Sequence, residues 1–136
     1  GDESVTTWTT VLIIAHSAQI RDSLLVLLRA SPRIEAVYQA KDGPSALAMG
    51  PEIQPSLVLI DYDTTPDELS LDLRQLNAAW PRARYLVLLD DEQDRLRVQS
   101  AGADIALVKG IRAATILETV EENLVAESPD LFGGRS

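Results

Sequence analysis

The sequence predicts an α/β domain with a parallel sheet covered by helices on both faces. Short apolar runs alternate with segments in which apolar residues recur at helical spacing. Uninterrupted apolar runs are typical of parallel strands that are buried on both faces. Five strands alternating with five helices indicate a doubly wound sheet with right-handed crossovers. In the second strand, Ile34, Ala36 and Tyr38 alternate with Arg33, Glu35 and Val37. The predicted strands cover residues 11–15, 33–38, 57–60, 85–89 and 105–108.

Length and composition indicate one globular domain. The chain has 136 residues, of which 46% are hydrophobic and 24% are charged, and this balance excludes a disordered chain. No apolar run approaches the roughly 20 residues that cross a bilayer. We expect an N-terminal extension over residues 1–8 and the domain over residues 9–126. We expect a flexible tail or linker over residues 127–136, where Ser-Pro and Gly-Gly pairs occur.

Charge and residue usage exclude several classes of function. Twelve basic and 21 acidic side chains give a net charge of −9, so the chain repels nucleic-acid phosphates. The absence of cysteine excludes disulfides, thiolate metal sites and a cysteine nucleophile, and a single histidine argues against histidine-rich metal sites. No signal peptide is visible, and we expect a cytoplasmic location. We expect no contact of this domain with nucleic acid or with a membrane.

Capping residues and apolar spacing define the helices. Ser17 is suited to cap the first helix, and the turn over residues 42–44 opens a short second helix. Thr65 and Glu68 form a capping box before the third helix, and the fourth, over residues 91–100, is polar. The helical residues expected to face the core are Ile20, Leu24, Leu27, Leu28, Leu69, Leu73, Leu76, Trp80, Leu96, Val98, Ala113, Ile116, Leu117, Val120 and Leu124.

In parallel sheets of this kind, ligands and chemistry gather beyond the carboxyl ends of the strands. Asp61 ends the third strand and Lys109 follows the fifth. An aspartate can accept a phosphoryl group as an acyl phosphate, and a lysine can supply a counter-charge. A structural alternative stays open, in which Asp61 is a solvated strand end or local cap that pairs with Lys109. No glycine-rich phosphate loop follows a strand, and Trp8 and Trp80 are expected to pack at element ends.

Three segments, in this order and spacing, resemble the receiver domain of bacterial two-component response regulators. The strand over residues 57–61 is similar to the family's strand that ends on the phospho-accepting aspartate. Residues 101–110 resemble its fifth-strand segment with the invariant lysine, and residues 40–43 resemble the turn that opens its second helix. The resemblance covers most of the chain. It implies a flavodoxin-like, doubly wound (βα)5 three-layer sandwich with sheet order 2-1-3-4-5.

The resemblance gives Asp61 the phospho-acceptor position and Lys109 the phosphate counter-charge position, but other site positions depart from the family. Receivers carry an acidic pair after the first strand to hold a metal, a hydroxyl at the end of the fourth strand, and an aromatic residue in the fifth. None of these groups is present here. The departing residues are Ala15 and His16 at the acidic pair, Leu89 at the hydroxyl and Ala106 at the aromatic position.

His16 and three further aspartates allow two interpretations each. His16 is either a cation beside Asp61 that replaces the metal's charge and makes the site sensitive to pH near 6 to 7, or an exposed or capping histidine at a strand-to-helix corner. Asp63, Asp90 and Asp91 either form a substitute acidic cluster with Asp61, or are a solvated residue and helix caps.

These departures favour a degenerate form, a pseudo-receiver, that works as a phosphorylation-independent protein–protein interaction module. We expect no enzymatic activity, no cofactor and no bound metal. We expect a protein partner or a neighbouring output domain, and a homodimer through the fourth helix, fifth strand and fifth helix. One alternative is a functional receiver that accepts a phosphoryl group on Asp61 from a histidine kinase and uses Mg²⁺. Another is a flavodoxin-like small-molecule binder, against which the aromatic content of 4% argues.

Overall fold

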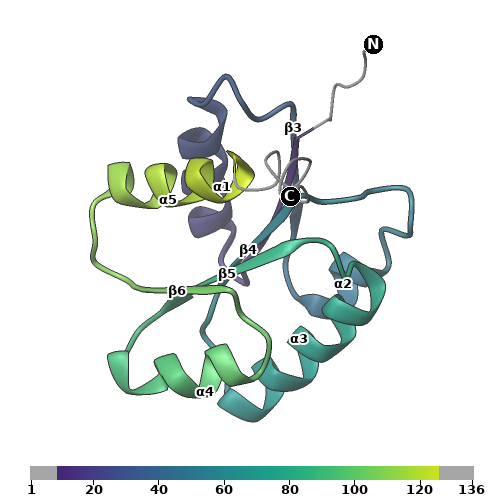
Figure 1. The fold of residues 1–136 in the computed structure, drawn as a ribbon, viewed down its shortest axis with the longest axis vertical. Helices are drawn as coiled ribbons and strands as arrows, with labels where there is room; N and C mark the ends of the chain where they lie inside the picture. The colour runs from purple at the N-terminus through teal and green to yellow at the C-terminus, as the bar shows by residue number, and fades with distance from the viewer. Residues whose placement is uncertain (1–8, 126–136) are drawn as a thin grey trace, which may run out of the picture.

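The structure is a computed structural model that describes residues 9–125. The predicted extension over residues 1–8, which includes Trp8, and the predicted tail over residues 127–136 lie outside the described residues. Five strands and the helices between them form a three-layer α/β fold (Figure 1). The strands are β2 (Thr10–Ile14), β3 (Ala36–Ala40), β4 (Leu57–Asp61), β5 (Arg84–Leu89) and β6 (Ile105–Val108).

The five strands form one sheet in the order β3-β2-β4-β5-β6, and all four strand pairs are parallel. Counted along the chain, this is the order 2-1-3-4-5 that the sequence predicts. The central strands are buried as their uninterrupted apolar runs indicate, and every residue of β4 is buried. The predicted fold class is therefore confirmed.

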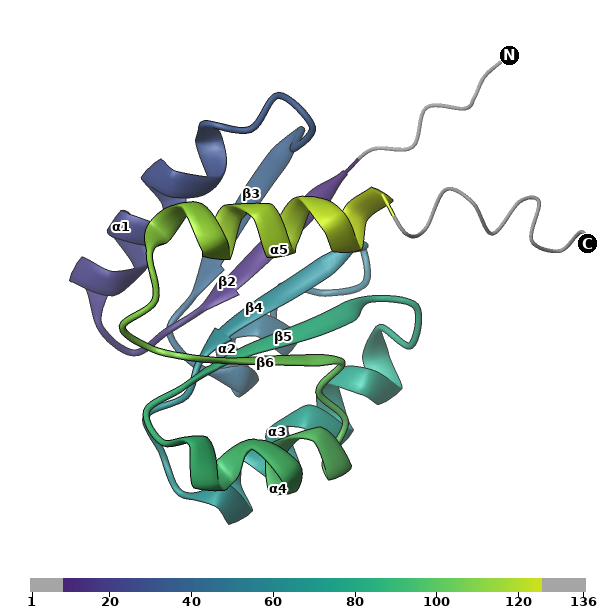
Figure 2. The ribbon, with the colours of Figure 1, turned by 60° about the vertical axis from the view of Figure 1, so that its left-hand side comes forward.

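Helices cover both faces of this sheet, as Figure 2 shows from the side. Alternate residues of β2 divide between two apolar cores. Val11 and Ile13 pack with residues of α1 and α5, whereas Leu12 and Ile14 pack with residues of α2, α3 and α4. The helices are α1 (Ala18–Arg29), α2 (Gly43–Leu47), α3 (Pro66–Ala79), a 3-10 turn η1 (Glu92–Asp94), α4 (Arg95–Ser100) and α5 (Ala113–Val125). Over residues 9–125, no helix has the length and apolarity that crossing a membrane requires.

Three helices begin at side-chain caps, of which Ser17 and Thr65 were predicted. The Ser17 side chain accepts a hydrogen bond from the Ile20 N–H, and the Asp42 side chain accepts one from the Ser45 N–H. Thr65 caps α3 by accepting from the Glu68 N–H. The second half of the predicted capping box is wrong, because the Glu68 carboxylate accepts from the Thr64 hydroxyl and not from the backbone of Thr65.

The second strand begins and ends later than the predicted residues 33–38, and one of its alternating residues is exposed. β3 begins at Ala36, so Ile34 precedes the strand. Tyr38 is paired with Leu12 and therefore lies on the α2 side of the sheet, yet its side chain is 41% exposed. The reason is that β3 is an edge strand and the five-residue α2 covers little of this face.

Two predicted core positions in the helices are also wrong. Leu96 is 77% exposed, while its near neighbour Val98 is 2% exposed. The predicted fourth helix is a 3-10 turn followed by six α-helical residues. Such a short helix has only a narrow face toward the sheet, and the side chain of Val98 fills it. Ala113 is exposed because it is the first residue of α5, before the helix reaches the sheet.

Candidate functional site

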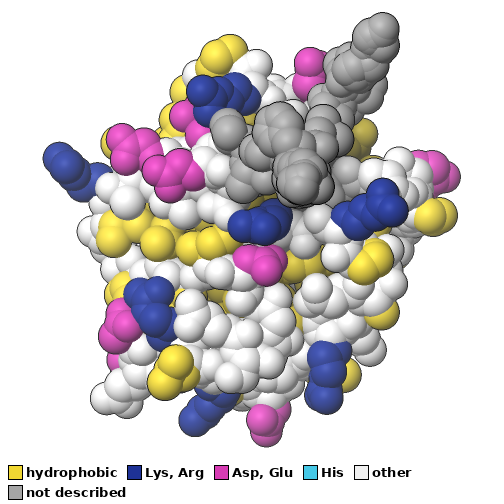
Figure 3. Space-filling view, viewed as in Figure 1, with side chains coloured by type: hydrophobic (Ala, Val, Ile, Leu, Met, Phe, Trp, Pro, Cys, Tyr) yellow, Lys and Arg dark blue, Asp and Glu magenta, His cyan; other side chains and the backbone are white. Residues whose placement is uncertain are grey.

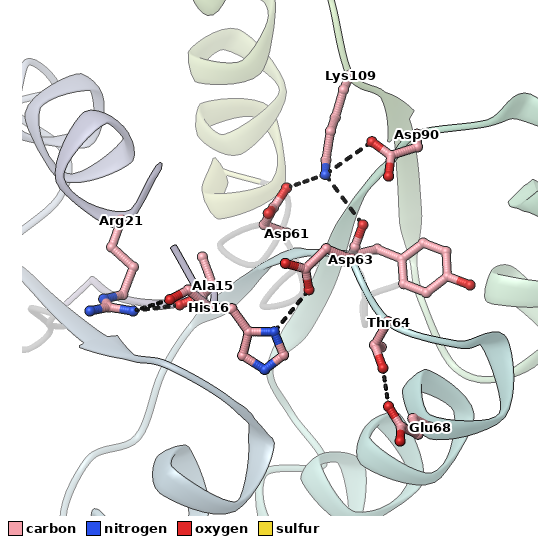
Figure 4. Close-up of polar contacts among 10 residues, drawn as sticks. Ala15, His16, Arg21, Asp61, Asp63, Thr64, Glu68, Asp90 and Lys109 are labelled. Atoms are coloured by element: carbon pink, nitrogen blue, oxygen red, sulfur yellow. Dashed lines mark hydrogen bonds and ion pairs between the residues drawn. The ribbon is translucent and has the colours of Figure 1, made fainter. Parts of the chain in front are cut away.

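The carboxyl ends of β4, β5 and β6 bring three charged side chains together (Figure 4). Lys109 Nζ lies 2.7 Å from Asp61 Oδ1 and 3.1 Å from Asp90 Oδ1. It also donates a hydrogen bond of 3.3 Å to the Tyr62 carbonyl oxygen. The two residues that the sequence predicts at this edge, Asp61 and Lys109, therefore face each other directly.

Backbone pairing places these side chains. Asp61 is the last residue of β4 and is paired with Leu88 of β5. Lys109 follows β6 directly, and its N–H donates to the Leu89 carbonyl at 2.6 Å, which prolongs the pairing of β5 and β6 by one residue. Gly110 then has a φ of +99°, a conformation that favours glycine, so the chain turns away while the lysine side chain stays over the sheet edge.

The charge of Lys109 is stabilised in this position. Its partial burial acts to lower its pKa, but hydrogen bonds to Asp61 and Asp90 outweigh the burial, so the pKa of Lys109 is raised above its ordinary value. The two carboxylates differ in exposure, since the Asp61 side chain is 2% exposed and that of Asp90 is 66% exposed. Asp61 is thus the buried anion of the network, and Asp90 is its solvated member.

One oxygen of the Asp61 carboxylate has no partner. Oδ1 receives Lys109, whereas Oδ2 is buried and accepts no hydrogen bond from any described residue. A buried acceptor without a donor is unfavourable, and a charged one more so. The arrangement leaves one position of Asp61 open to a donor or a cation.

Three of the four departing positions hold apolar side chains that neither bind a hard cation nor donate a hydrogen bond. The Ala15, Leu89 and Ala106 side chains are 1%, 0% and 1% exposed. They pack in the sheet and its core, and none carries a polar side-chain atom. The hydroxyl and aromatic groups that receivers carry therefore have no substitute at these positions.

His16 pairs with Asp63 and not with Asp61. Its Nδ1 lies 3.0 Å from Asp63 Oδ1, and the imidazole is 54% exposed. This geometry favours the interpretation of an exposed histidine at the corner between β2 and α1. Arg21 was not among the predicted site residues, yet its Nη1 donates to the carbonyl oxygens of Ala15 at 2.7 Å and His16 at 3.1 Å. Arg21 lies one turn after Ser17, the cap of α1, and this spacing could have indicated that its side chain reaches the backbone before the helix.

The further aspartates have separate roles. Asp90 pairs with Lys109, while Asp91 caps η1 by accepting from the Gln93 N–H at 2.9 Å. Within residues 9–125, no three His, Cys, Asp or Glu side chains converge closely enough to hold a metal ion. Mg²⁺ prefers oxygen ligands in near-octahedral geometry, and Ala15 and His16 do not supply the acidic pair that receivers use together with the aspartate.

A small cavity beside Asp61 is lined by two acidic residues that were not among the predicted site residues. Its volume is about 30 Å³, and Asp42 from the cap of α2 and Asp72 from α3 are part of its wall. Burial and then the nearby Asp42 carboxylate raise the pKa of Asp72 above its ordinary value. Their meeting depends on how α2 packs on α3, which the spacing along the chain does not reveal.

The chain is similar in sequence to a bacterial regulatory protein and in structure to receiver domains. No protein-family model matches the chain. The transcriptional regulatory protein DegU of Brevibacillus brevis is 26% identical over 113 residues, which are 82% of this chain and 48% of that protein. The chain thus spans about half the length of this curated relative.

Solved structures give the same result at the level of the fold. A CheY-like response regulator receiver domain from Methanospirillum hungatei has a TM-score of 0.78 and 20% identity, covering 91% of this chain and 99% of the other. A LuxR family DNA-binding response regulator from Silicibacter pomeroyi has a TM-score of 0.73 and 23% identity, covering 87% and 93%. A response regulator from Thermotoga maritima has a TM-score of 0.72 and 22% identity, covering 88% and 99%.

The chain has the receiver fold. The curated similarity, at 26% identity, extends over most of the same residues. At the carboxyl edge of this fold, Asp61 and Lys109 lie where the sequence resemblance expects them.

Proposed function

We propose that this receiver domain is a phosphorylation-independent protein–protein interaction module with no enzymatic activity. The observation that carries the proposal is the surroundings of Asp61. Lys109 is the one cation that contacts its carboxylate among the described residues, and the positions of the acidic pair, the hydroxyl and the aromatic residue hold Ala15, His16, Leu89 and Ala106.

Phosphoryl transfer to Asp61 is slow in such a site for an electrostatic reason. A carboxylate must approach a phosphate of like charge, and the charge on the transferring oxygens must be stabilised as the bond forms. Lys109 supplies one stabilising group. Removing a single positioned donor from a catalytic site typically costs a factor of about 10²–10³ in rate. Since several donors are missing here, the domain is expected to signal without a phosphoryl group on Asp61.

The Asp61–Lys109 pair has a structural role under this proposal. Asp61 is 2% exposed, so its charge requires a cation nearby. Lys109 meets this need and at the same time contacts Asp90 and the Tyr62 carbonyl. The pair thereby joins the ends of β4, β5 and β6, which explains why both residues are present without phosphoryl chemistry.

The partners follow from the fold and from the surface. We expect a protein partner or an output domain, since the curated relative is a transcriptional regulatory protein of which the matched residues make up only 48%. A homodimer through α4, β6 and α5 is expected as well. Figure 3 shows apolar side chains along the β6 edge beside α5. Ile105 and Leu107 of this edge strand are only partly buried, and Leu96 of α4 is 77% exposed.

A restoring variant tests the proposal. We expect Ala15→Asp/His16→Asp/Leu89→Thr to gain Mg²⁺-dependent modification by a small acyl-phosphate donor, with the parent chain as the unmodified control. The melting temperature of the parent should not change with millimolar Mg²⁺, because only a ligand present well above its Kd stabilises the folded state. A clear upward shift in the parent that Asp61→Asn abolishes would contradict the proposal.

A functional phospho-receiver is the second candidate. The 2.7 Å contact between Lys109 and Asp61 favours it, because this contact is the arrangement that a phosphate counter-charge requires. The prediction that separates the two candidates is modification of the parent chain itself at Asp61.

A flavodoxin-like small-molecule binder has less support. Small-molecule pockets typically measure about 300–1,000 Å³. The cavity beside Asp61 has about 30 Å³, and a hollow at the opposite sheet edge, beside Trp80, has about 180 Å³. Visible absorbance of the purified protein is the direct test for a bound flavin.

A further inference from the structure

β3 is an edge strand with one neighbouring strand in the described part of the chain. The sheet order places it beside β2 at one margin of the sheet, where Figure 2 shows it. Its five residues pair with consecutive residues of β2, so the strand is regular and contains no bulge. A regular edge strand presents a row of backbone N–H and C=O groups to which a further strand can be added.

The backbone groups on the outer side of β3 belong to Val37 and Gln39. The Ala40 carbonyl oxygen accepts a hydrogen bond of 3.1 Å from the Ala15 N–H, so Ala40 directs its backbone groups toward β2. These groups alternate in direction along a strand, so those of Tyr38 also point to β2, whereas those of Val37 and Gln39 point away from it. No described residue forms a hydrogen bond with the outward groups.

The side chains of β3 offer none of the features that prevent one edge strand from pairing with another. Natural edge strands are protected by charged side chains, prolines or bulges. The residues of β3 include neither a charge nor a proline, and Tyr38 is 41% exposed. The opposite edge differs, because the Arg95 guanidinium donates to the Ala106 carbonyl oxygen of β6. β3 is therefore the edge at which a further strand meets the least hindrance.

The residues that flank β3 indicate which strand is added. Glu35 precedes the strand, Lys41 follows it, and both side chains are exposed. Tyr38 lies midway, three residues from each of them. If two copies of the chain pair antiparallel about a two-fold axis at Tyr38, Glu35 of each copy lies opposite the partner's Lys41. Opposite charges across a strand pair are stabilising, whereas like charges are destabilising. The charges of this edge are thus complementary to those of a second copy.

The backbone of β3 supports the same register. In an antiparallel pair, the residues whose groups face the partner exchange hydrogen bonds. A two-fold axis at Tyr38 places Val37 opposite the partner's Gln39, so the outward groups of both residues find donors and acceptors. Tyr38 then lies at a non-hydrogen-bonded position, where facing side chains approach most closely, and its exposed ring packs against the ring of the partner's Tyr38.

We propose that two copies of this chain associate through β3, as an antiparallel strand pair with Tyr38 on the two-fold axis. The five-stranded sheet of one copy then continues into the sheet of the other. Because the paired strands are short and interfaces below about 1,200 Å² are weak, we expect a Kd on the order of 1 mM. This surface is separate from the face at α4, β6 and α5. It does not depend on whether Asp61 accepts a phosphoryl group, so its failure leaves the proposed function untouched.

Oxidative cross-linking of Tyr38→Cys tests the register, because the chain contains no other cysteine. Facing residues at a non-hydrogen-bonded position have Cβ atoms about 4.5–5.5 Å apart, close to the spacing in a disulfide. At ~100 μM under mild oxidation, we expect Tyr38→Cys to form a disulfide-linked dimer at least about fivefold faster than random encounter allows, since even a weak pair brings the thiols together repeatedly. Leu71→Cys is the matched control for random encounter, because Leu71 is an apolar residue of α3 that is 50% exposed.

Charge variants of Tyr38→Cys test the two-fold pairing at constant ionic strength. Glu35→Lys places a lysine opposite the partner's Lys41 and should slow the cross-linking by about threefold to tenfold. The exchange Glu35→Lys/Lys41→Glu restores opposite charges across the axis and keeps the net charge of the parent. It should therefore restore the rate, which a purely local effect of Glu35 on the fold would not do.

Three results would overturn the proposal. One is cross-linking of Tyr38→Cys that is no faster than that of Leu71→Cys. Another is a rate that Glu35→Lys leaves unchanged, because the strands would then pair in another register or not at all. The third is an exchanged variant that stays as slow as Glu35→Lys, because the two charges would then not meet across the axis.

Discussion

Lys109 has three contacts at the sheet edge, to Asp61, to Asp90 and to the Tyr62 carbonyl oxygen. Lys109→Met leaves the buried Asp61 carboxylate without a cation. We expect the free energy of unfolding to fall by about 2–3 kcal/mol, less than for a fully buried pair because Lys109 is partly exposed. Asp61→Asn should cost less, because Lys109 keeps Asp90 and solvent. Urea unfolding measures both, and a larger loss in Asp61→Asn would contradict this account.

Asp72 is expected to destabilise the protein at neutral pH. Its pKa is raised in the folded state by burial and by Asp42, so the folded state binds the proton more tightly than the unfolded state does. Stability is therefore favoured below the unfolded pKa of about 3.9 and declines as the pH rises through the folded pKa. Asp72→Asn should raise the melting temperature at pH 7, and the gain should vanish below about pH 4.

Asp67→Asn is the control for this measurement. Asp67 is exposed in the first turn of α3, where a carboxylate stabilises the helix N-terminus. Its replacement should lower the melting temperature slightly at pH 7, a change of the opposite sign. An Asp72→Asn variant that is less stable than the parent at pH 7 would show that this carboxylate has a partner in solution.

At the scale of elements, Tyr85 joins β5 to the end of α3. Its side chain is fully buried, and its hydroxyl lies 2.9 Å from the carbonyl oxygens of both Leu76 and Trp80. Burial and then the nearby Asp104 raise the pKa of Tyr85 above its ordinary value. The unfolded chain thus releases this proton at a lower pH than the folded chain does. The free energy of unfolding is therefore unaffected by Tyr85 below pH ~10 and falls as the pH rises further.

Tyr85→Phe should make this alkaline loss shallower. One titrating group contributes at most about 1.4 kcal/mol per pH unit. At neutral pH, the variant should be less stable by about 1 kcal/mol because it lacks the hydrogen bond. Urea unfolding between pH 7 and pH 11 compares the two slopes. Equal slopes of the free energy of unfolding against pH in the parent and the variant would show that folding does not raise the pKa of Tyr85, which would contradict this prediction.

The sequence predicts the elements well where one physical signal dominates. The apolar runs of β2, β4 and β5 and the cap residues Ser17 and Thr65 define elements that the structure confirms. The predictions fail where the packing of neighbouring elements decides whether a side chain is buried. Tyr38 is exposed because α2 is short, and Leu96 is exposed because α4 follows a 3-10 turn. The spacing of apolar residues in one element does not predict how long the helix that covers it will be.

The same distinction applies to the site. Asp61 and Lys109 were predictable because parallel strands end at one edge, so residues at strand ends meet whatever the helices do. The pairing of His16 with Asp63 and the approach of Asp72 to Asp42 depend on loop paths and on helix packing. These contacts join residues far apart in the chain, and no spacing rule connects them.

At the scale of the whole molecule, self-association is expected to be constitutive. Under the proposed function the domain has no phosphate trigger, so no phosphorylation step is needed to create its dimer face, which we expect at α4, β6 and α5. Sedimentation at ~100 μM should give a dimer, since this concentration lies well above a micromolar Kd. Leu96→Glu should give a monomer, because it places a charge on an exposed apolar residue of this face. A parent chain that sediments as a pure monomer would contradict this prediction.

The central claim is that Asp61 is not a phosphoryl acceptor, and intact mass after treatment with acyl phosphate and Mg²⁺ tests it most directly. Asp61 has Lys109 beside it, but the positions that would supply a metal ligand and a hydroxyl hold Ala15 and Leu89. We expect the mass of the parent chain to stay unchanged, as in the Asp61→Asn control. A phosphoryl-sized gain in the parent that is absent from Asp61→Asn would contradict the account and establish a functional phospho-receiver.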